Sequence, residues 1–544
     1  MTITRLRNFA LTLGLGTALA SVLLYAAAPE KPAPAQVQGA GRYFKPDDIA
    51  TDGSVGTASG RVNYTAHAGT LVVHAKNWDD VAVPANAEKE DKEAAAQNPG
   101  AEASMFYAAY FKKGVGEGQR PIMFLFNGGP GSATVWLHMG AFGPRRVVTS
   151  DDAHTPAAPY RVVDNQWSLL DAADLVFIDA PGAGFSRIAG KDKEKAFWGI
   201  DEDAHAFSEF INQFLTKYSR WNSPKYIFGE SYGTTRAAVL SNMLQSNYAI
   251  DLNGVIMLSQ ILNFDMSADG PQVNPGVNLP YQLALPTYAA SAWYHNKLPG
   301  QKPADLRTFL GEVQHFAMGD YAQALQAGSA LNDQQRNMIA QRLHNYTGLR
   351  TDYILRADLR IDGGMFEQNL QDAAELTTGR LDTRFSGPSL DPLDKEADYD
   401  PQSASISSAY ISAFNDYARD GLKYGEGRKY YLFAPIKEWD FKHQQPGSGE
   451  ALQTSPNVMP DLAVAMKTNP NLRVMLNAGF YDLATPYYEG IYEMRQLPIP
   501  RALQSHIEYK QYESGHMVYA HEQSLKEIHD AVADFVRRTD NVGR

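Results

Sequence analysis

A serine enclosed by glycines, in the segment Gly229-Glu230-Ser231-Tyr232-Gly233, is the strongest local constraint on the fold. It follows an apolar run, residues 225–228, and precedes a helix-compatible segment, residues 234–244. So sharp a turn from strand to helix needs glycines on both sides, because the backbone segments approach closely while the serine hydroxyl is lifted into the open. This setting, more than the five-residue pattern alone, predicts that Ser231 is a nucleophile.

Apolar runs alternate with amphipathic segments on both sides of this turn. Strands are expected at residues 175–178, 254–258, 472–476 and 506–512, and helices at residues 207–218 and 522–537. Such alternation indicates a mostly parallel central sheet covered by helices on both faces. Together with the serine turn, it predicts an α/β-hydrolase fold. Residues 105–111 and 121–126 bound a polar turn and are expected to pair as a hairpin.

The alternation stops between residues 263 and 460, where helical patterns and Pro/Gly-rich loops indicate a large, mainly helical cap insertion. We therefore expect the hydrolase core at residues 105–262 and 461–544. Residues 36–104 form an N-terminal extension, with strand-like pieces at 61–65 and 70–74 and a charged, Ala-rich loop at 85–103.

The first 35 residues have the features of an export signal. Arg5 and Arg7 precede an uncharged stretch, residues 9–28, and Ala33-Pro34-Ala35 offers a cleavage site before Gln36. The expected location is the periplasm or the cell exterior. An uncleaved membrane anchor is the alternative, since about 20 apolar residues can span a bilayer.

The composition and the motifs exclude several kinds of partner, catalysis and cofactor. The net charge of −12 would repel nucleic acid, and the absence of cysteine excludes disulfides and thiolate catalysis. No His, Asp or Glu cluster has metal-ligand spacing, and no glycine pattern suits a dinucleotide. We therefore expect neither a metal nor another cofactor.

Ser231 needs a base, and in this fold the acid and then the histidine follow the serine along the chain. Asp482 lies just past the strand at 472–476, and His516 lies between the last strand and the last helix. Both therefore fall at the sheet edge where Ser231 is expected, with His516 as base and Asp482 orienting it. The rival residues are His521, His529 and Asp179, the last of which we interpret as closing a structural turn.

A second glycine motif, Asn127-Gly128-Gly129-Pro130-Gly131, directly follows the strand ending at Phe126. Consecutive glycines can direct backbone N–H groups inward, so we expect the N–H groups of Gly129 and Tyr232 to form an oxyanion hole. The alternative is a tight turn without chemical consequence.

With these motifs the sequence resembles the serine carboxypeptidase family. The resemblance rests on the two glycine motifs, on Gly515-His516-Met517, and on the segment from Trp167-Ser168 to Asp179-Ala180-Pro181-Gly182-Ala183-Gly184-Phe185-Ser186. It implies release of a C-terminal residue from a peptide through an acyl-enzyme on Ser231. It also implies that Asn127 and Glu230 hold the substrate's terminal carboxylate by hydrogen bonds, and that Gly128 and Met517 belong to the substrate-binding site.

The chain departs from the family pattern at three positions: Leu125 stands where an aromatic residue is usual, Ser132 where a cysteine is often found, and Ala141 where an acidic residue is usual. The chain could therefore be another serine acyl hydrolase on the same fold, such as an aminopeptidase, esterase or acyltransferase. A non-catalytic exported binding protein is the third hypothesis.

Overall fold

The computed structural model describes residues 43–79, 88–89, 98–448, 451 and 455–542. The expected signal segment, residues 1–35, and much of the charged loop at 85–103 lie outside them.

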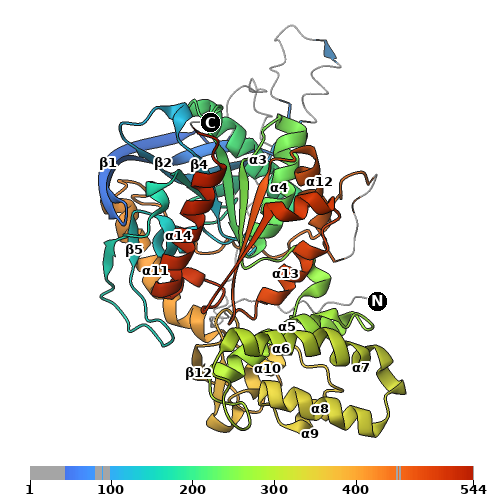
Figure 1. The fold of residues 1–544 in the computed structure, drawn as a ribbon. Coiled ribbons are helices and arrows are strands. Elements are labelled where there is room, and N and C mark those ends of the chain that lie inside the picture. Colours follow the sequence, from blue (N-terminus) through green and yellow to red (C-terminus); the bar gives the residue numbers. More distant parts are fainter. Residues whose placement is uncertain (1–42, 80–87, 90–97, 449–450, 452–454, 543–544) are drawn as a thin grey trace, which may run out of the picture.

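One large sheet organises the described part of the chain (Figure 1). Its strand order is β1-β2-β3-β7-β4-β9-β10-β13-β14, with β8 paired to β3, and the run from β7 to β14 is parallel. The strands are β1 (Asp47–Thr57), β2 (Gly60–His74), β3 (Glu102–Lys112), β4 (Ile122–Phe126), β7 (Asp174–Ile178), β8 (Arg187–Ala189), β9 (Lys225–Glu230), β10 (Gly254–Leu258), β13 (Arg473–Gly479) and β14 (Ile507–Tyr512). Two small pairs complete the strands: β5 (Arg145–Val147) with β6 (Val162–Asp164), and β11 (Leu376–Thr378) with β12 (Ser386–Pro388).

The hairpin expected at residues 105–126 is wrong. β3 and β4 are not neighbours, because β7 lies between them, antiparallel to β3 and parallel to β4. Every residue of β4 is buried, as expected for a strand inside a parallel sheet. The polar turn therefore belongs to a crossover, which local turn signals do not distinguish from a hairpin.

The two strand-like pieces at 61–65 and 70–74 form one strand, β2, and with β1 they extend the same sheet. Gly69 lies inside β2, where a Cβ atom would come within 2.2 Å of the Asp47 carbonyl oxygen. The glycine thus permits close approach of β1 without ending the strand.

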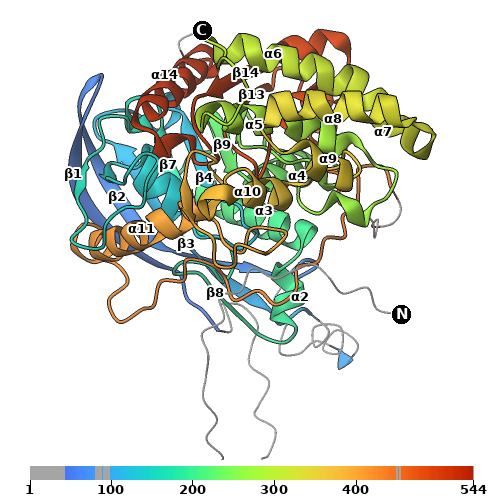
Figure 2. The same cartoon turned by 90° about the horizontal axis from the view of Figure 1, so that it is seen from below.

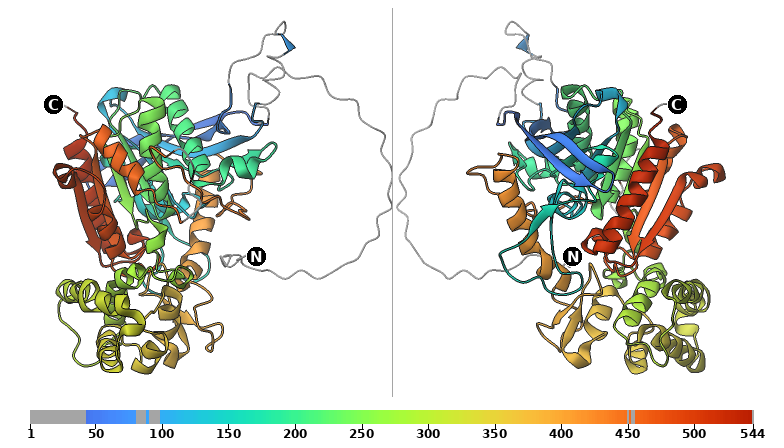
Figure 3. Two further views of the ribbon diagram at one scale, coloured as in Figure 1. Left: turned by 90° about the vertical axis from the view of Figure 1, so that its right-hand side faces the viewer. Right: turned by 60° about the vertical axis from the view of Figure 1, so that its left-hand side comes forward.

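Helices cover both faces of the sheet. α3 (Ile200–Lys217), α4 (Tyr232–Tyr248) and α12 (Met459–Thr468) pack on one face, and α14 (Glu522–Thr539) packs on the other (Figures 1 and 3). The stripe expected on α3 faces inward: Phe207, Phe210 and Phe214 are fully buried. Each such side chain stabilises the core by roughly 1.5–3 kcal/mol. A mostly parallel sheet with helices on both faces and the serine turn after β9 is the α/β-hydrolase fold.

The cap helices form a layer beyond one end of the sheet (Figures 1 and 3), and in the view from below they overlap the core (Figure 2). They are α5 (Leu279–Tyr294), α6 (Leu306–Phe316), α7 (Ala322–Ala327), α8 (Asp333–Thr347), α9 (Thr351–Arg356) and α10 (Gly363–Asn369). Residues 380–383 connect this layer to the loops after β13 and β14. The carbonyl oxygen of Arg380 accepts from Leu483 N at 3.0 Å, and that of Leu381 accepts from His516 N at 2.6 Å. The cap therefore lies over the carboxyl ends of the parallel strands.

The later part of the inserted segment returns to the core. α11 (Pro401–Asp420) packs against β5 and the helical turn η2 (Leu137–Phe142), and isolated bridges join Ser132 to Phe433 and Gly199 to Asp440. The remaining helices are α2 (Lys193–Phe197) and α13 (Tyr487–Arg495). The segment 263–460 thus has one part above the sheet and one part beside it.

Candidate active site

The turn that carries Ser231 has the strained geometry expected from its glycines. Ser231 follows β9 directly and has φ 61° and ψ −132°, a conformation that costs a non-glycine residue roughly 1–3 kcal/mol. Its N–H donates to the Leu258 carbonyl at 3.0 Å. A Cβ on Gly229 would lie 2.1 Å from the Gly233 oxygen, so this turn requires glycine there. The structure therefore confirms the expected strand–turn–helix arrangement.

Asp482 and His516 come together from the loops after β13 and β14. His516 Nδ1 lies 2.9 Å from Asp482 Oδ2, and the two side chains are 3% and 0% exposed. Thr485 fixes the carboxylate by donating its N–H to Oδ1 at 3.0 Å and its hydroxyl to Oδ2 at 2.7 Å. Burial lowers the pKa of His516, but the Asp482 carboxylate more than offsets this, so the pKa lies above its ordinary value.

The rival residues have other partners. His521 Nδ1 lies 2.8 Å from the Ser524 hydroxyl, and His529 on α14 lies between Asp171 and Asp530. The Asp179 carboxylate accepts from Thr134 N at 2.8 Å, which ties two loops together. The contacts of Asp179 thus fit the structural turn that the sequence suggested.

The glycine motif after β4 lies against the first turn of α4. A Cβ on Gly128 would come within 2.4 Å of Tyr232 N, so only glycine permits this approach. Gly129 has φ +108°, which also favours glycine. Within the described residues, no backbone hydrogen bond uses the N–H of Gly129 or of Tyr232. Both donors are therefore unoccupied by backbone acceptors, beside the turn that carries Ser231.

Glu230 forms the centre of a buried polar group beside Ser231. The Tyr519 hydroxyl lies 3.1 Å from Oε1 and 2.9 Å from Oε2 of Glu230, and both residues are almost fully buried. Burial raises the pKa of Glu230 to about 7, against the charge of His516 and hydrogen bonds from Tyr519 and Asn127. A carboxyl group that changes charge near neutral pH thus lies next to the candidate nucleophile.

The other expected substrate-binding residues lie in the same region. Asn127 Oδ1 accepts from Leu137 N at 3.1 Å, which leaves the amide N–H groups for other partners. The Gly128 carbonyl accepts from Ser132 N at 3.0 Å. Met517 follows His516 and is 6% exposed.

Sequence reasoning missed three residues that organise the site: Tyr519, Thr485 and Arg236. Of these, Thr485 had a usable signal, since a threonine three positions after an aspartate commonly bonds back to it. Arg236 lies in α4, the helix that follows Ser231, and is 1% exposed. It donates to Asp203 Oδ2 at 2.6 Å and to the Asn127 carbonyl at 2.8 Å, so it connects α4, α3 and the glycine motif.

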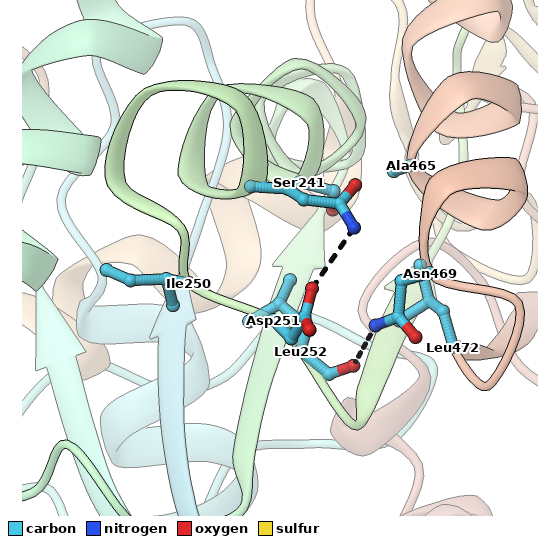
Figure 4. A pocket seen from close by; sticks show the side chains of 8 residues that line it. Ser241, Ile250, Asp251, Leu252, Ala465, Asn469 and Leu472 are labelled. Carbon is cyan, nitrogen blue, oxygen red and sulfur yellow. Dashed lines mark hydrogen bonds between the residues drawn. The ribbon is translucent and has the colours of Figure 1, made fainter.

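The pocket in Figure 4 is remote from these residues. It lies between α4 and α12, and its lining includes Asp251 and Leu252, which precede β10. Ser231, Asp482 and His516 come after the carboxyl ends of β9, β13 and β14, whereas Asp251 and Leu252 come before the amino end of β10. The pocket and the candidate site therefore lie at opposite ends of the parallel strands. The Gln245 amide donates to Asp251 at 3.1 Å, and Asn469 donates to the Leu252 carbonyl at 2.9 Å. The polar groups of this pocket are thus engaged with one another.

Two further features concern only the residues that the structure describes. None of their helices has the length and apolar character needed to cross a bilayer. Their His, Asp and Glu side chains do not gather in any group of three or more that could hold a metal ion.

Comparison with known proteins gives partial matches among individual relatives. Pheromone-processing carboxypeptidase KEX1 of Cryptococcus gattii is 31% identical over 117 residues, 21% of this chain and 16% of that protein. Serine carboxypeptidase ctsa-3.2 of Caenorhabditis elegans is 26% identical over 183 residues, 32% of this chain and 33% of that protein. The chain thus covers well under two thirds of either relative.

Among solved structures, Kex1(delta)p, a prohormone-processing carboxypeptidase of Saccharomyces cerevisiae, matches with a TM-score of 0.48 and 14% identity, over 87% of this chain and 91% of that one. The family model described as serine carboxypeptidase matches residues 95–531, which include the glycine motifs, the acid and the histidine. The chain therefore belongs to the serine carboxypeptidase family.

Proposed function

We propose that this chain is an exported serine carboxypeptidase that releases C-terminal residues from peptides through an acyl-enzyme on Ser231. The observation that carries the proposal is the buried Asp482–His516 pair at the same sheet edge as the strained Ser231 turn. The cap helices α5 to α10 of the inserted segment cover this edge and would shape the peptide site.

In this mechanism Asp482 engages His516 Nδ1, so Nε2 is the nitrogen that serves Ser231. The Ser231 oxygen attacks the scissile carbonyl carbon while its proton passes to Nε2. The N–H groups of Gly129 and Tyr232 stabilise the oxyanion. Collapse of the intermediate expels the C-terminal residue, whose amine takes the proton from His516. Water then hydrolyses the ester, with His516 again accepting and returning a proton.

The proposed site for the substrate's terminal carboxylate comprises Asn127 and Glu230, and Gly128 and Met517 are the other proposed substrate-binding residues. Two carboxyl groups share a hydrogen bond only when one carries a proton, because two negative charges in a desolvated site repel. Glu230, with a pKa of about 7, can supply that proton at neutral pH and below.

Binding of a free C-terminus should therefore weaken as pH rises and Glu230 ionises. We expect KM for a blocked dipeptide acid to rise above pH 7, by up to about tenfold per pH unit. KM for the dipeptide amide should change little, because the amide carries no charge. Steady-state kinetics of both substrates between pH 5 and 9 measures the difference.

Glu230→Gln is the matched variant, since it keeps the size of the side chain but cannot ionise. It should flatten the curve for the free acid and leave that for the amide unchanged. If acid and amide show the same pH dependence in the parent protein, Glu230 does not bind the terminal carboxylate. Another acyl hydrolase activity then becomes the better account.

We also propose that residues 1–35 are a signal peptide, on the basis of Arg5, Arg7 and the Ala33-Pro34-Ala35 site. N-terminal sequencing of protein recovered from the cell envelope should find a mature chain that begins at or near Gln36. An intact mass that includes residues 1–28, found in membranes, would instead favour an anchor.

A further inference from the structure

Tyr519 lies in hydrogen-bond contact with Glu230, and nothing in the sequence pattern assigned it a role. It belongs to the short turn η10 (Val518–Ala520), three residues after His516. Its hydroxyl lies within hydrogen-bond distance of both Glu230 oxygens, at 3.1 and 2.9 Å. The side chain is 2% exposed, so water does not compete strongly for either group.

The ring of Tyr519 packs against the helical turn η2. Gly140 and Ala141 belong to η2, and Ala141 is fully buried. At the preceding Gly140, a Cβ would lie 2.3 Å from the Tyr410 hydroxyl and 2.8 Å from the Tyr519 ring. Two tyrosine rings therefore occupy the space beside Gly140.

A phenol and a carboxyl group affect Glu230 differently. A second carboxyl group would share one proton with Glu230 and raise its pKa by like-charge repulsion. Burial raises the pKa of Tyr519 well above its ordinary value, so its hydroxyl keeps its proton and acts as a donor. A donor to Glu230 stabilises the ionised carboxylate, and it also fixes the orientation of the protonated carboxyl group.

The geometry points to Tyr519 as a positioning residue for the substrate's terminal carboxylate. Its hydroxyl donates to one oxygen of Glu230, so the proton on the other oxygen is directed toward the substrate. This inference rests on the proposed function, in which Glu230 binds the free C-terminus.

Other groups also act on Glu230 and have to be separated from Tyr519. His516 lowers the pKa of Glu230 by its charge, Asn127 lowers it by a hydrogen bond, and Asp482 raises it. Burial raises the pKa of Tyr410, on α11, and the charge of Glu230 raises it further. His516 acts on acid and amide substrates alike, so the ratio of their KM values isolates the effect on Glu230.

The decisive variant is Tyr519→Phe, which keeps the ring beside Gly140 and removes the donor. The acid-to-amide ratio of KM should increase by about three- to tenfold at pH 6, because Glu230 loses its orientation. The midpoint of its rise with pH should move upward by about one unit, because the ionised carboxylate loses a donor. For the amide, kcat should stay within about twofold of the parent value.

Tyr410→Phe is the matched control, since the structure shows no hydrogen bond between Tyr410 and Glu230. It should leave both the ratio and the midpoint unchanged. Incorporating 3-fluorotyrosine in place of Tyr519 strengthens the hydrogen-bond donor that Tyr519→Phe removes, and it preserves the packing of the ring. A more acidic hydroxyl is a stronger donor, so the midpoint should move to lower pH.

The outcomes distinguish a failure of the inference about Tyr519 from a failure of the proposed function. If the parent protein distinguishes acid from amide but neither change at Tyr519 moves the midpoint, Tyr519 only packs and the inference is overturned. The inference is likewise overturned if Tyr519→Phe alters the acid and amide KM values equally. If the parent does not distinguish the substrates at all, the proposed function fails, and this inference fails with it.

Discussion

Ser231→Ala is expected to lower kcat for a blocked dipeptide by at least about a thousandfold while the protein stays folded. The substitution removes the only atom that can form the acyl-enzyme in the proposed mechanism, and alanine fits a position whose backbone is already fixed by the turn. His516→Ala should cause a loss of the same order, because the Ser231 hydroxyl then has no base. Steady-state kinetics and circular dichroism of the purified variants measure both properties.

Ser241→Ala, in the helix α4 that follows Ser231, provides the matched control. Its hydroxyl donates to the Ala237 carbonyl at 2.6 Å, at the edge of the sheet remote from the site, so activity should stay near the parent value. A fluorophosphonate probe should label Ser231 in the parent and in Ser241→Ala. Labelling of another serine, or nearly full activity in Ser231→Ala, would show that the nucleophile has been misassigned.

Arg236→Met should be the most destabilising single substitution near the site, reducing the free energy of unfolding by about 3–5 kcal/mol. Arg236 is fully enclosed: its guanidinium pairs with Asp203 at 2.6 Å and stacks on Phe207 at 4.2 Å. Methionine can fill most of the volume but leaves the Asp203 carboxylate buried without a counter-charge. The Asn127 carbonyl also loses its donor, so the glycine motif should become less ordered.

Urea unfolding of Arg236→Met, Asp203→Asn and the double variant separates packing from charge. The double variant removes both charges and should recover roughly 1–2 kcal/mol relative to Arg236→Met alone. A loss below about 1 kcal/mol in Arg236→Met would contradict the view that this ion pair holds α3, α4 and the glycine motif together.

The elements that carry the chemistry could be predicted from the sequence because each had a local signal. β9 and α4 are marked by the glycines around Ser231, and the strand before Asp482 is marked by a short apolar run. The fixed chain order of serine, acid and histidine in this fold then selected Asp482 and His516. The structure brings these two into direct contact.

The errors arose where the deciding interaction is non-local. The turn after β3 carries no information that β7 will insert beside it, so a hairpin was expected. Likewise, the contact between Tyr519 and Glu230 joins residues 289 positions apart, and a Cβ at Gly140 would clash with the Tyr519 ring. Arg236 lies in an ordinary helical pattern, and its burial follows only from the packing of α3 against α4.

The central claim is that this chain shortens peptides from the carboxyl end by means of Ser231. Incubating a defined peptide mixture with the parent protein and with Ser231→Ala, followed by mass spectrometry, tests it most directly. We expect stepwise loss of C-terminal residues in the parent sample, protection of peptides with amidated ends at low pH relative to free acids, and no shortening with Ser231→Ala. Shortening from the amino end, or cleavage at internal bonds that depends on Ser231, would contradict it.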